Sequence, residues 1–309
     1  MTQAASTLAS PAEDILGPQP RLRALRRFIR LQPLGTIGAS IIAVIVFGAI
    51  AAPLLHTSDP RAFGEDVLKS PSGEHFFGTD RDGKDVWSRI LYGGRVSLKV
   101  GLATVIMSVV GGTVIALAAG FIGGFLDFAF GRVADILIAF PAILFALTIR
   151  TSFGEELPDF PGLSKQEFVL VISIAIIFTP VIYRIMRGAV LEQRSATYVE
   201  AARAIGASQT RLMFRHVLPN LAGLMIVVTS TTLPAAILTE SALSFLGVGV
   251  EQGTPSWGGD LSGKARTFFT RAPWIAIFPG LALSLTVLAF NLLGDSLRDT
   301  LDPRLRNRR

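Results

Sequence analysis

The sequence contains one near-match to a motif with a chemical mechanism, a glycine-rich loop of the kind that cradles phosphates. Gly258, Gly263 and Lys264 have its spacing, with four residues between the two glycines. However, Ala265 stands where a serine or threonine would hold magnesium, and no hydrophobic strand precedes the loop. We interpret the match as coincidence and predict that this chain itself binds neither ATP nor Mg²⁺.

A second group, Asp80, Asp82 and Asp85, carries the oxygen ligands that calcium prefers. Gly83 comes too early for an EF-hand loop, and Leu91 occupies the place of its last glutamate. We therefore favour a turn held by the aspartate side chains. The chain has no cysteine and three scattered histidines, and no serine-histidine-aspartate or paired-carboxylate pattern is recognisable. The sequence predicts no metal site and no catalytic site.

The most distinctive stretch is 197–220, TYVEAARAIGASQTRLMFRHVLPN, a polar and basic insert between two long apolar runs. Thr197 followed three residues later by Glu200 is a capping-box pattern and predicts a short helix from residue 198. Gly206 stands where that helix should end, because glycine enters the left-handed conformation without a Cβ penalty. Ser208 can cap a second helix. Pro219 is expected to stop that helix, because proline lacks an amide donor.

The rest of the chain must position this insert. Half of the 309 residues are hydrophobic, and they gather in blocks of about 20, the length of a bilayer-spanning helix. We predict an all-α integral membrane protein with six transmembrane helices. The expected spans are 34–55, 96–121, 133–149, 168–186, 221–243 and 275–293. The net charge of +6 is explained by bases that flank the spans, so the lipid bilayer and not nucleic acid is the expected partner.

The spans divide the chain into a tail, a transmembrane domain and a second tail. The expected regions are a cytoplasmic tail (1–33), the six-span domain (34–295) and a basic cytoplasmic tail (296–309), with external loops at 56–95 and 244–274 and a cytoplasmic loop at 188–219. Within the first tail, RLRALRRFIRL at 21–31 is either a helix lying in the membrane surface or a plain basic flank. Lysine and arginine favour the side that holds both termini and the insert, which is therefore predicted to be cytoplasmic.

Polar residues of the fifth span could line a pathway. The candidates are Ser230, Thr231, Thr232, Thr239 and Glu240, although the hydroxyls could equally pack helices together. A charge at the bilayer centre would cost about 2.5 to 3.5 kcal/mol. For Glu240 we therefore favour an interfacial glutamate bonded to a neighbouring helix over a contact with the transported molecule.

Two further patterns concern packing. Small residues at every fourth position of the second span should let another helix approach closely: Gly112, Ala116, Gly120 and Gly124. Charged residues near the inner end of the third span could pair with one another: Asp127, Arg132 and Asp135. Arg184 and Arg187 lie at the end of the fourth span, where long side chains can reach the membrane surface.

The insert resembles the EAA loop of ABC importer permeases, which docks into a groove on the ATP-hydrolysing subunit. The residues that carry this resemblance, in order and spacing, are Glu200, Ala201, Ala202, Gly206, Leu218 and Pro219. Three other stretches resemble the dipeptide, oligopeptide and nickel branch of these importers, specifically its second, C-type permease subunit: 75–101, 238–250 followed by 254–258, and 272–304. The resemblance covers nearly the whole chain from about residue 30.

This resemblance implies a type I importer permease fold and a set of partners. The chain would form a heterodimer with a homologous permease, two cytoplasmic ATP-binding subunits would use ATP and magnesium, and an extracytoplasmic binding protein would deliver cargo. Residues 200–206 would form the coupling helix seated on an ATPase, in a prokaryotic plasma membrane. Peptides are the cargo we favour, and the chain itself would not be an enzyme. The alternative is a secondary transporter driven by protons through Glu240 or Asp135.

Overall fold

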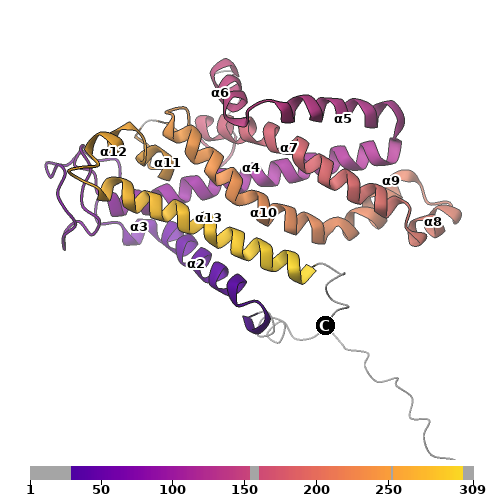
Figure 1. The fold of residues 1–309 in the computed structure, drawn as a ribbon, viewed down its shortest axis with the longest axis horizontal. Coiled ribbons are helices and arrows are strands. Elements are labelled where there is room, and N and C mark those ends of the chain that lie inside the picture. Colours follow the sequence, from indigo (N-terminus) through magenta and orange to yellow (C-terminus); the bar gives the residue numbers. More distant parts are fainter. Residues whose placement is uncertain (1–28, 154–159, 252, 302–309) are drawn as a thin grey trace, which may run out of the picture.

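The computed structural model describes residues 29–153, 160–251 and 253–301. The predicted surface helix at 21–31 lies almost entirely outside these residues. Within them the chain folds into helices joined by loops (Figure 1). Their bounds are α2 Pro33–Ile50, α3 Ala52–Leu55, α4 Val86–Ile122, α5 Gly124–Ala139, α6 Ala142–Phe153, α7 Lys165–Arg194, α8 Thr197–Ala204, α9 Gln209–Arg211, the π-helix η1 Leu212–Val217, α10 Leu218–Phe245, α11 Trp257–Asp260, α12 Gly263–Phe268 and α13 Trp274–Leu301.

Five helices of the described residues are long and apolar enough to cross a membrane, with a sixth crossing if a bent pair is counted as one span. The five are α2, α4, α7, the run 209–245 and α13. The bent pair is α5 with α6, whose axes meet at 103°. The prediction of an all-α protein with six apolar segments is therefore confirmed in its main features.

The third span differs from the prediction of one straight helix at 133–149. Proline lacks an amide donor and disfavours the helical conformation of the residue before it. Phe140 accordingly adopts an extended backbone and ends α5, and α6 begins just after Pro141. α5 also begins nine residues before the predicted span, at Gly124. The apolar run was recognised correctly, but its break was missed.

Other helices extend beyond their predicted ends. α4 begins at Val86, ten residues before the predicted span, because Asp85 caps it by accepting a hydrogen bond from the amide of Ser88. The first loop is correspondingly shorter than 56–95. α7 continues to Arg194, inside the predicted loop 188–219, and α13 continues to Leu301, so the boundary placed at 295 falls within a helix.

The centre of the bundle is the contact between α4 and α7. A Cβ atom on Gly112 would lie 2.9 Å from the backbone nitrogen of Tyr183, and one on Gly120 would lie 2.5 Å from Cγ1 of Val190. Ala116 between them is fully buried. The predicted stripe of small residues thus brings two backbones together, except at Gly124, which starts α5 and has open space around it.

The insert between the fourth and fifth spans and the loops predicted to be external lie at opposite ends of the long axis. Figure 1 shows α8 and α9 at one end of the molecule and α3, α11 and α12 at the other, with α4, α7, α10 and α13 running between them. α2 packs along α13 on one edge, and α5 packs along α7 on the other. We call the end that holds α3, α11 and α12 the outer end, because its loops are the ones predicted to be external.

Candidate functional site

The first candidate site is a helical hairpin made of α8, a tight turn and the run α9–η1. α8 starts one residue earlier than predicted, with Ala196 at its N-cap and no side-chain cap. The capping box of Thr197 and Glu200 is therefore wrong, because Thr197 is already the first helical residue. Glu200 remains in the first turn, where its negative charge interacts favourably with the helix dipole.

The turn after α8 confirms the predicted role of glycine. Gly206 has a φ of +84°. Its amide donates to the carbonyl of Arg203 at 3.0 Å, and the amide of Ala207 donates to the carbonyl of Ala202 at 3.1 Å. This pair of bonds is the Schellman motif, which satisfies carbonyls at the end of a helix. Ser208 then caps α9 as predicted, accepting from the amide of Arg211 at 3.4 Å.

The expected stop at Pro219 is wrong. The chain passes from α9 through η1 into α10 without a break, and residues 209–245 behave as one long helix. Pro219 lies in the first turn of α10, directly after the π-helical turn. In that turn the amide of Leu218 donates to the carbonyl of Met213, five residues back, so the hydrogen-bond register has changed before the proline is reached. The hairpin is therefore continuous with the fifth span.

The hairpin has one buried face and one exposed face. Val199 and Ala202 of α8 are buried together with Leu212 and Val217 of η1. The other residues named from the sequence lie on or near the surface: Glu200, Ala201, Gly206 and Pro219 are exposed, and Leu218 is half-buried. Beside them Ile205 is 88% exposed, an apolar side chain at the tip of the hairpin that the sequence analysis did not single out.

Polar contacts fasten the hairpin to the helix on either side. Tyr198 donates from its hydroxyl to Oε1 of Gln193 at 2.6 Å. Asn220 donates from Nδ2 to that hydroxyl at 3.2 Å and to the carbonyl of His216 at 2.6 Å. α8 is thus tied to both α7 and α10 by side-chain hydrogen bonds. Apart from the polarity of these three residues, nothing in the sequence indicates this cluster.

Charged pairs join α5 to α7 near the hairpin. Arg187 contacts Asp127 and Arg184 contacts Asp135, so these arginines are paired with α5 and do not simply reach the membrane surface as expected. The predicted contact of Arg132 with Asp135 is present at 3.5 Å. In addition, Nη1 of Arg194 donates to the carbonyl of Gly120 at 2.6 Å, which ties the end of α7 to the end of α4.

The candidate pathway residues lie along α10. Ser230, Thr231 and Thr239 donate from their hydroxyls to carbonyls four residues back, at 2.9, 2.9 and 2.8 Å, and Thr232 is half-buried. Such bonds satisfy a hydroxyl inside a helix without requiring a neighbour. Whether these side chains line a pathway stays a prediction.

Glu240 differs from the interfacial position that we expected. Its side chain is fully buried. Ser244 of the same helix donates to Oε1 at 2.8 Å and Ser241 donates to Oε2 at 3.2 Å. Ser97 of the neighbouring α4 also interacts with this carboxylate, so the predicted contact with another helix is present although the position is buried.

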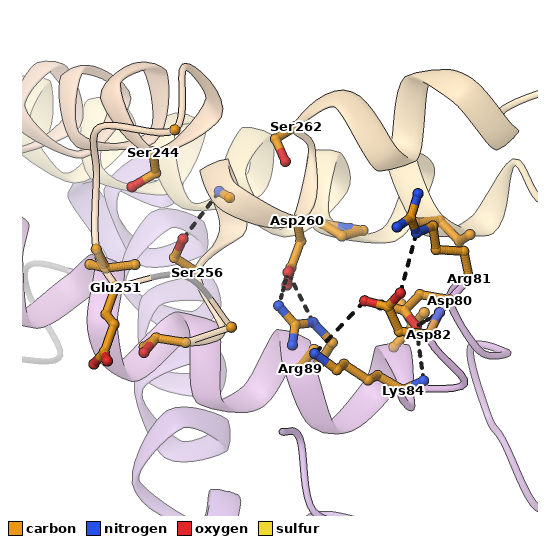
Figure 2. A pocket seen from close by; sticks show the side chains of 18 of the residues that line it. Asp80, Arg81, Asp82, Lys84, Arg89, Ser244, Glu251, Ser256, Asp260 and Ser262 are labelled. Atoms are coloured by element: carbon orange, nitrogen blue, oxygen red, sulfur yellow. Dashed lines mark hydrogen bonds and ion pairs between the residues drawn. The ribbon is translucent and has the colours of Figure 1, made fainter. Parts of the chain in front are cut away.

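The second candidate site is a cavity of about 590 Å³ at the outer end, which we call the outer cavity (Figure 2). It lies between the start of α4, the loop after α10, α11 and the start of α13. One wall is the turn 80–84, where Oδ1 of Asp80 accepts from the amides of Asp82 and Lys84, both at 2.8 Å. The predicted aspartate-held turn is confirmed there.

A buried ion pair closes one side of the outer cavity. Nε of Arg89 donates to Oδ1 of Asp260 at 2.9 Å, and Nη1 donates to the carbonyl of Pro60 at 3.0 Å. Burial raises the pKa of Asp260, and the charge of Arg89 opposes that shift. The pair was not predicted, because Arg89 fell within a segment that we read as a loop and its partner is 171 residues away in the sequence.

Comparison with known proteins agrees with this architecture. Residues 112–307 match the family model described as the binding-protein-dependent transport system inner membrane component. A putative peptide transport system permease protein of Brucella suis is 39% identical over 307 residues, 99% of each chain. A dipeptide transport system permease protein of Alkalihalophilus pseudofirmus is 36% identical over 99% of each chain, and a glutathione transport system permease protein of Pectobacterium atrosepticum is 38% identical over 91% of this chain and 90% of the relative. This chain belongs to the family of binding-protein-dependent transport system inner membrane components, the permeases of ABC importers.

Proposed function

We propose that this chain imports short peptides as the second permease subunit of an ABC importer. The observation that carries the proposal is the agreement between two features. Relatives that align over nearly the full chain are described as peptide, dipeptide or glutathione permeases. The segment that resembles a coupling loop is a hairpin closed by a Schellman turn, with an exposed surface, and it is continuous with a membrane-spanning helix. The subunit itself carries out no chemical reaction.

The hairpin is the proposed contact with an ATPase subunit. Glu200, Ala201 and Ile205 present a mixed charged and apolar surface, which suits a groove on a soluble partner. The Schellman turn at Gly206 holds this surface in one conformation. Since residues 209–245 form one helix, a push on the hairpin moves the fifth span directly. ATP and magnesium act in the two ATPase subunits, whose closure would tip the spans from inward-open to outward-open.

The proposed assembly places both termini and the hairpin in the cytoplasm of a prokaryotic cell. The distribution of lysine and arginine supports this orientation. The separation of the hairpin from the outer end along the long axis also supports it, because a coupling surface and a surface for an extracytoplasmic binding protein must lie on opposite sides (Figure 1). A homologous permease would form the other half of the pathway. From this chain, the proposed lining residues are Ser230, Thr231, Thr232, Thr239 and Glu240.

The test is transport by the reconstituted complex. We would reconstitute this chain with its partner permease and ATPases in proteoliposomes, add the cognate binding protein, and follow uptake of radiolabelled dialanine. Uptake that requires ATP and the binding protein supports the proposal. The same chain without ATPases, under an imposed pH gradient, is the second arm. Dialanine uptake there would show a proton-driven secondary transporter and overturn the proposal.

A further inference from the structure

A chain of side-chain hydrogen bonds crosses the insert from the end of α7 to the start of α10. The hydroxyl of Tyr198, on α8, donates to Oε1 of Gln193 at 2.6 Å and accepts from Nδ2 of Asn220 at 3.2 Å. Nδ2 of Asn220 also donates to the carbonyl of His216 at 2.6 Å. Because a phenol hydroxyl is both donor and acceptor, one atom of α8 is bonded to the helices on both sides of the hairpin.

The carbonyl of His216 lies in the π-helical turn η1, where the backbone ladder is irregular. The amide of Leu218 donates five residues back, and Pro219 has no amide to donate. The side-chain amide of Asn220 adds a bond to the run at the point where regular backbone bonds are interrupted. Tyr198 is bonded to that same amide group, so the polar contact of α8 is made at an irregular part of the helix 209–245.

The apolar contact between α8 and η1 does not by itself set the angle between them. Val199 and Ala202 of α8 are buried together with Leu212 and Val217 of η1. Apolar burial is non-directional, whereas a hydrogen bond requires a particular distance and angle. The bonds of Tyr198 therefore select one rotation of α8 among those that bury the same apolar side chains. Tyr198 is 39% exposed, so removal of its hydroxyl leaves no cavity in this contact.

We propose that Tyr198, together with Asn220, is a positioning residue for energy coupling. The inference rests on the proposed function, in which α8 contacts an ATPase subunit and α10 crosses the membrane. Glu200 and Ala201 belong to the same eight-residue helix as Tyr198, so the rotation that Tyr198 fixes also sets where they point relative to α10. With the bonds formed, a displacement of α8 turns α10 as well. Without them, α8 rotates on its apolar contact and part of the displacement is lost.

The first measurement tests the orientation of α8 directly. The chain has no cysteine, so Ala204→Cys on α8 and Ala235→Cys on α10, both exposed, give two unique positions for spin labels. The distance distribution between the labels is recorded by double electron–electron resonance on the complete permease–ATPase complex in nanodiscs, with cysteine-free partner subunits. Tyr198→Phe keeps the ring and removes only the hydroxyl, and it is compared with the native tyrosine.

Tyr92→Phe is the matched control, because it makes the same change at the outer end. The Tyr92 ring contacts His56 and Arg95, but its hydroxyl forms no hydrogen bond within the residues that the structure describes. The second measurement is the ATPase rate of the same complexes with and without the binding protein. The ratio of the two rates reports coupling, whereas the unstimulated rate, co-purification of the ATPases and the melting temperature report assembly and folding.

We expect Tyr198→Phe to broaden the distance distribution and to lower the stimulation by the binding protein about fivefold, the change in an equilibrium that loss of an exposed hydrogen bond or two produces. The unstimulated rate, co-purification and melting temperature stay at the native level, which separates positioning from a general structural role. Asn220→Ala lowers the stimulation as well. Adding Tyr198→Phe to it costs less than in the native chain, because the contact between the two side chains is already absent. Tyr92→Phe behaves like the native chain in both measurements.

Three outcomes overturn the inference: an unchanged distance distribution in Tyr198→Phe, a broadened distribution with native stimulation, or an equal loss of stimulation in Tyr92→Phe. Each of them leaves the proposed function intact if the native chain co-purifies with the ATPase subunits and imports dialanine with ATP. Failure of the native chain to assemble with ATPase subunits overturns the proposed function, and the inference with it. A complex that couples through Tyr198 but imports no dialanine overturns the proposed cargo alone.

Discussion

Replacement of Gly206 by valine should reduce the binding-protein-stimulated ATPase activity of the assembled complex without unfolding the membrane domain. Gly206 has a φ of +84°, and a Cβ atom added there would meet nothing within 4 Å. The substitution therefore causes no steric clash, and its whole cost is the backbone penalty of about 1–2 kcal/mol for a side chain in the left-handed region. A β-branched residue lies at the upper end of that cost.

This penalty shifts the equilibrium between the Schellman turn and more open turns by about 5- to 30-fold. We expect the binding-protein-stimulated ATPase rate of the reconstituted complex to fall by at least about fivefold, while membrane insertion and the melting temperature of the bundle stay near the native values. Asparagine tolerates the left-handed region, so Gly206→Asn should lose least and Gly206→Ala should be intermediate.

Gly188→Val is the matched control. Gly188 is exposed on α7, has nothing within 4 Å of its Cβ position, and has an ordinary helical backbone. The same change of side chain there costs no left-handed strain. If Gly206→Val supported native stimulated ATPase activity, or if Gly188→Val reduced it equally, the conformation of this turn would not be what transmits the signal.

The remaining predictions concern the hairpin tip, the helix contact and the buried ion pair. Ile205→Asp replaces an apolar side chain that is 88% exposed, so we expect about tenfold weaker co-purification of the ATPase subunits with no change in folding. Co-purification at the level of the native chain would show that the ATPase contact lies elsewhere. Gly120→Leu should destabilise the bundle by about 1–3 kcal/mol, because its Cβ atom alone would lie 2.5 Å from a methyl carbon of Val190 on α7. The control Gly131→Leu has open space around its Cβ position and should melt near the native temperature. Arg89→Met leaves the Asp260 carboxylate buried without its counter-ion and should lower the free energy of unfolding by about 3–5 kcal/mol, measured by thermal unfolding. The double variant with Asp260→Leu should recover most of that loss. No recovery would mean that Arg89 acts through other contacts.

Local chemistry was predictable where the deciding partners are close in sequence. Gly206 ends α8 and Ser208 starts α9 because both act through hydrogen bonds within a few residues. Pro219 shows the limit of the same reasoning. The lost amide donor was identified correctly, but a π-helical turn before it lets Leu218 bond five residues back, and the helix continues. A neighbouring turn can thus accommodate a proline that a local rule treats as a stop.

Contacts between distant segments could not be predicted in this way. The first turns of α4 are polar, and we therefore predicted a loop there. One of these polar residues, Arg89, is paired with Asp260 of α11, 171 residues away, and this partner cannot be recognised from the local sequence. Glu240 was expected near the membrane interface and bonded to a neighbouring helix; it is instead fully buried, with Ser241 and Ser244 of its own helix and Ser97 of α4 around its carboxylate. In each case the residue type was noted but its environment was set by tertiary packing.

The hairpin and the outer cavity are joined by one structural element. Residues 209–245 span 37 residues, about 55 Å at 1.5 Å per residue. At one end this helix carries the exposed hairpin, and at the other Ser244 both lines the cavity and donates to the buried Glu240. The opposite wall, which includes Arg89, belongs to α4. A tilt of α10 against α4 must therefore change the cavity.

Two positions along this helix weaken its hydrogen-bond ladder, η1 and Pro234. Bending of the helix is expected to concentrate there, because a π-helical turn and an internal proline each interrupt the regular bonds. Ser244 lies beyond both positions and is itself a residue of α10, so this part of the cavity wall should move as a unit with the last turns of the helix. A push on the hairpin would then reach the outer cavity as a displacement of that unit.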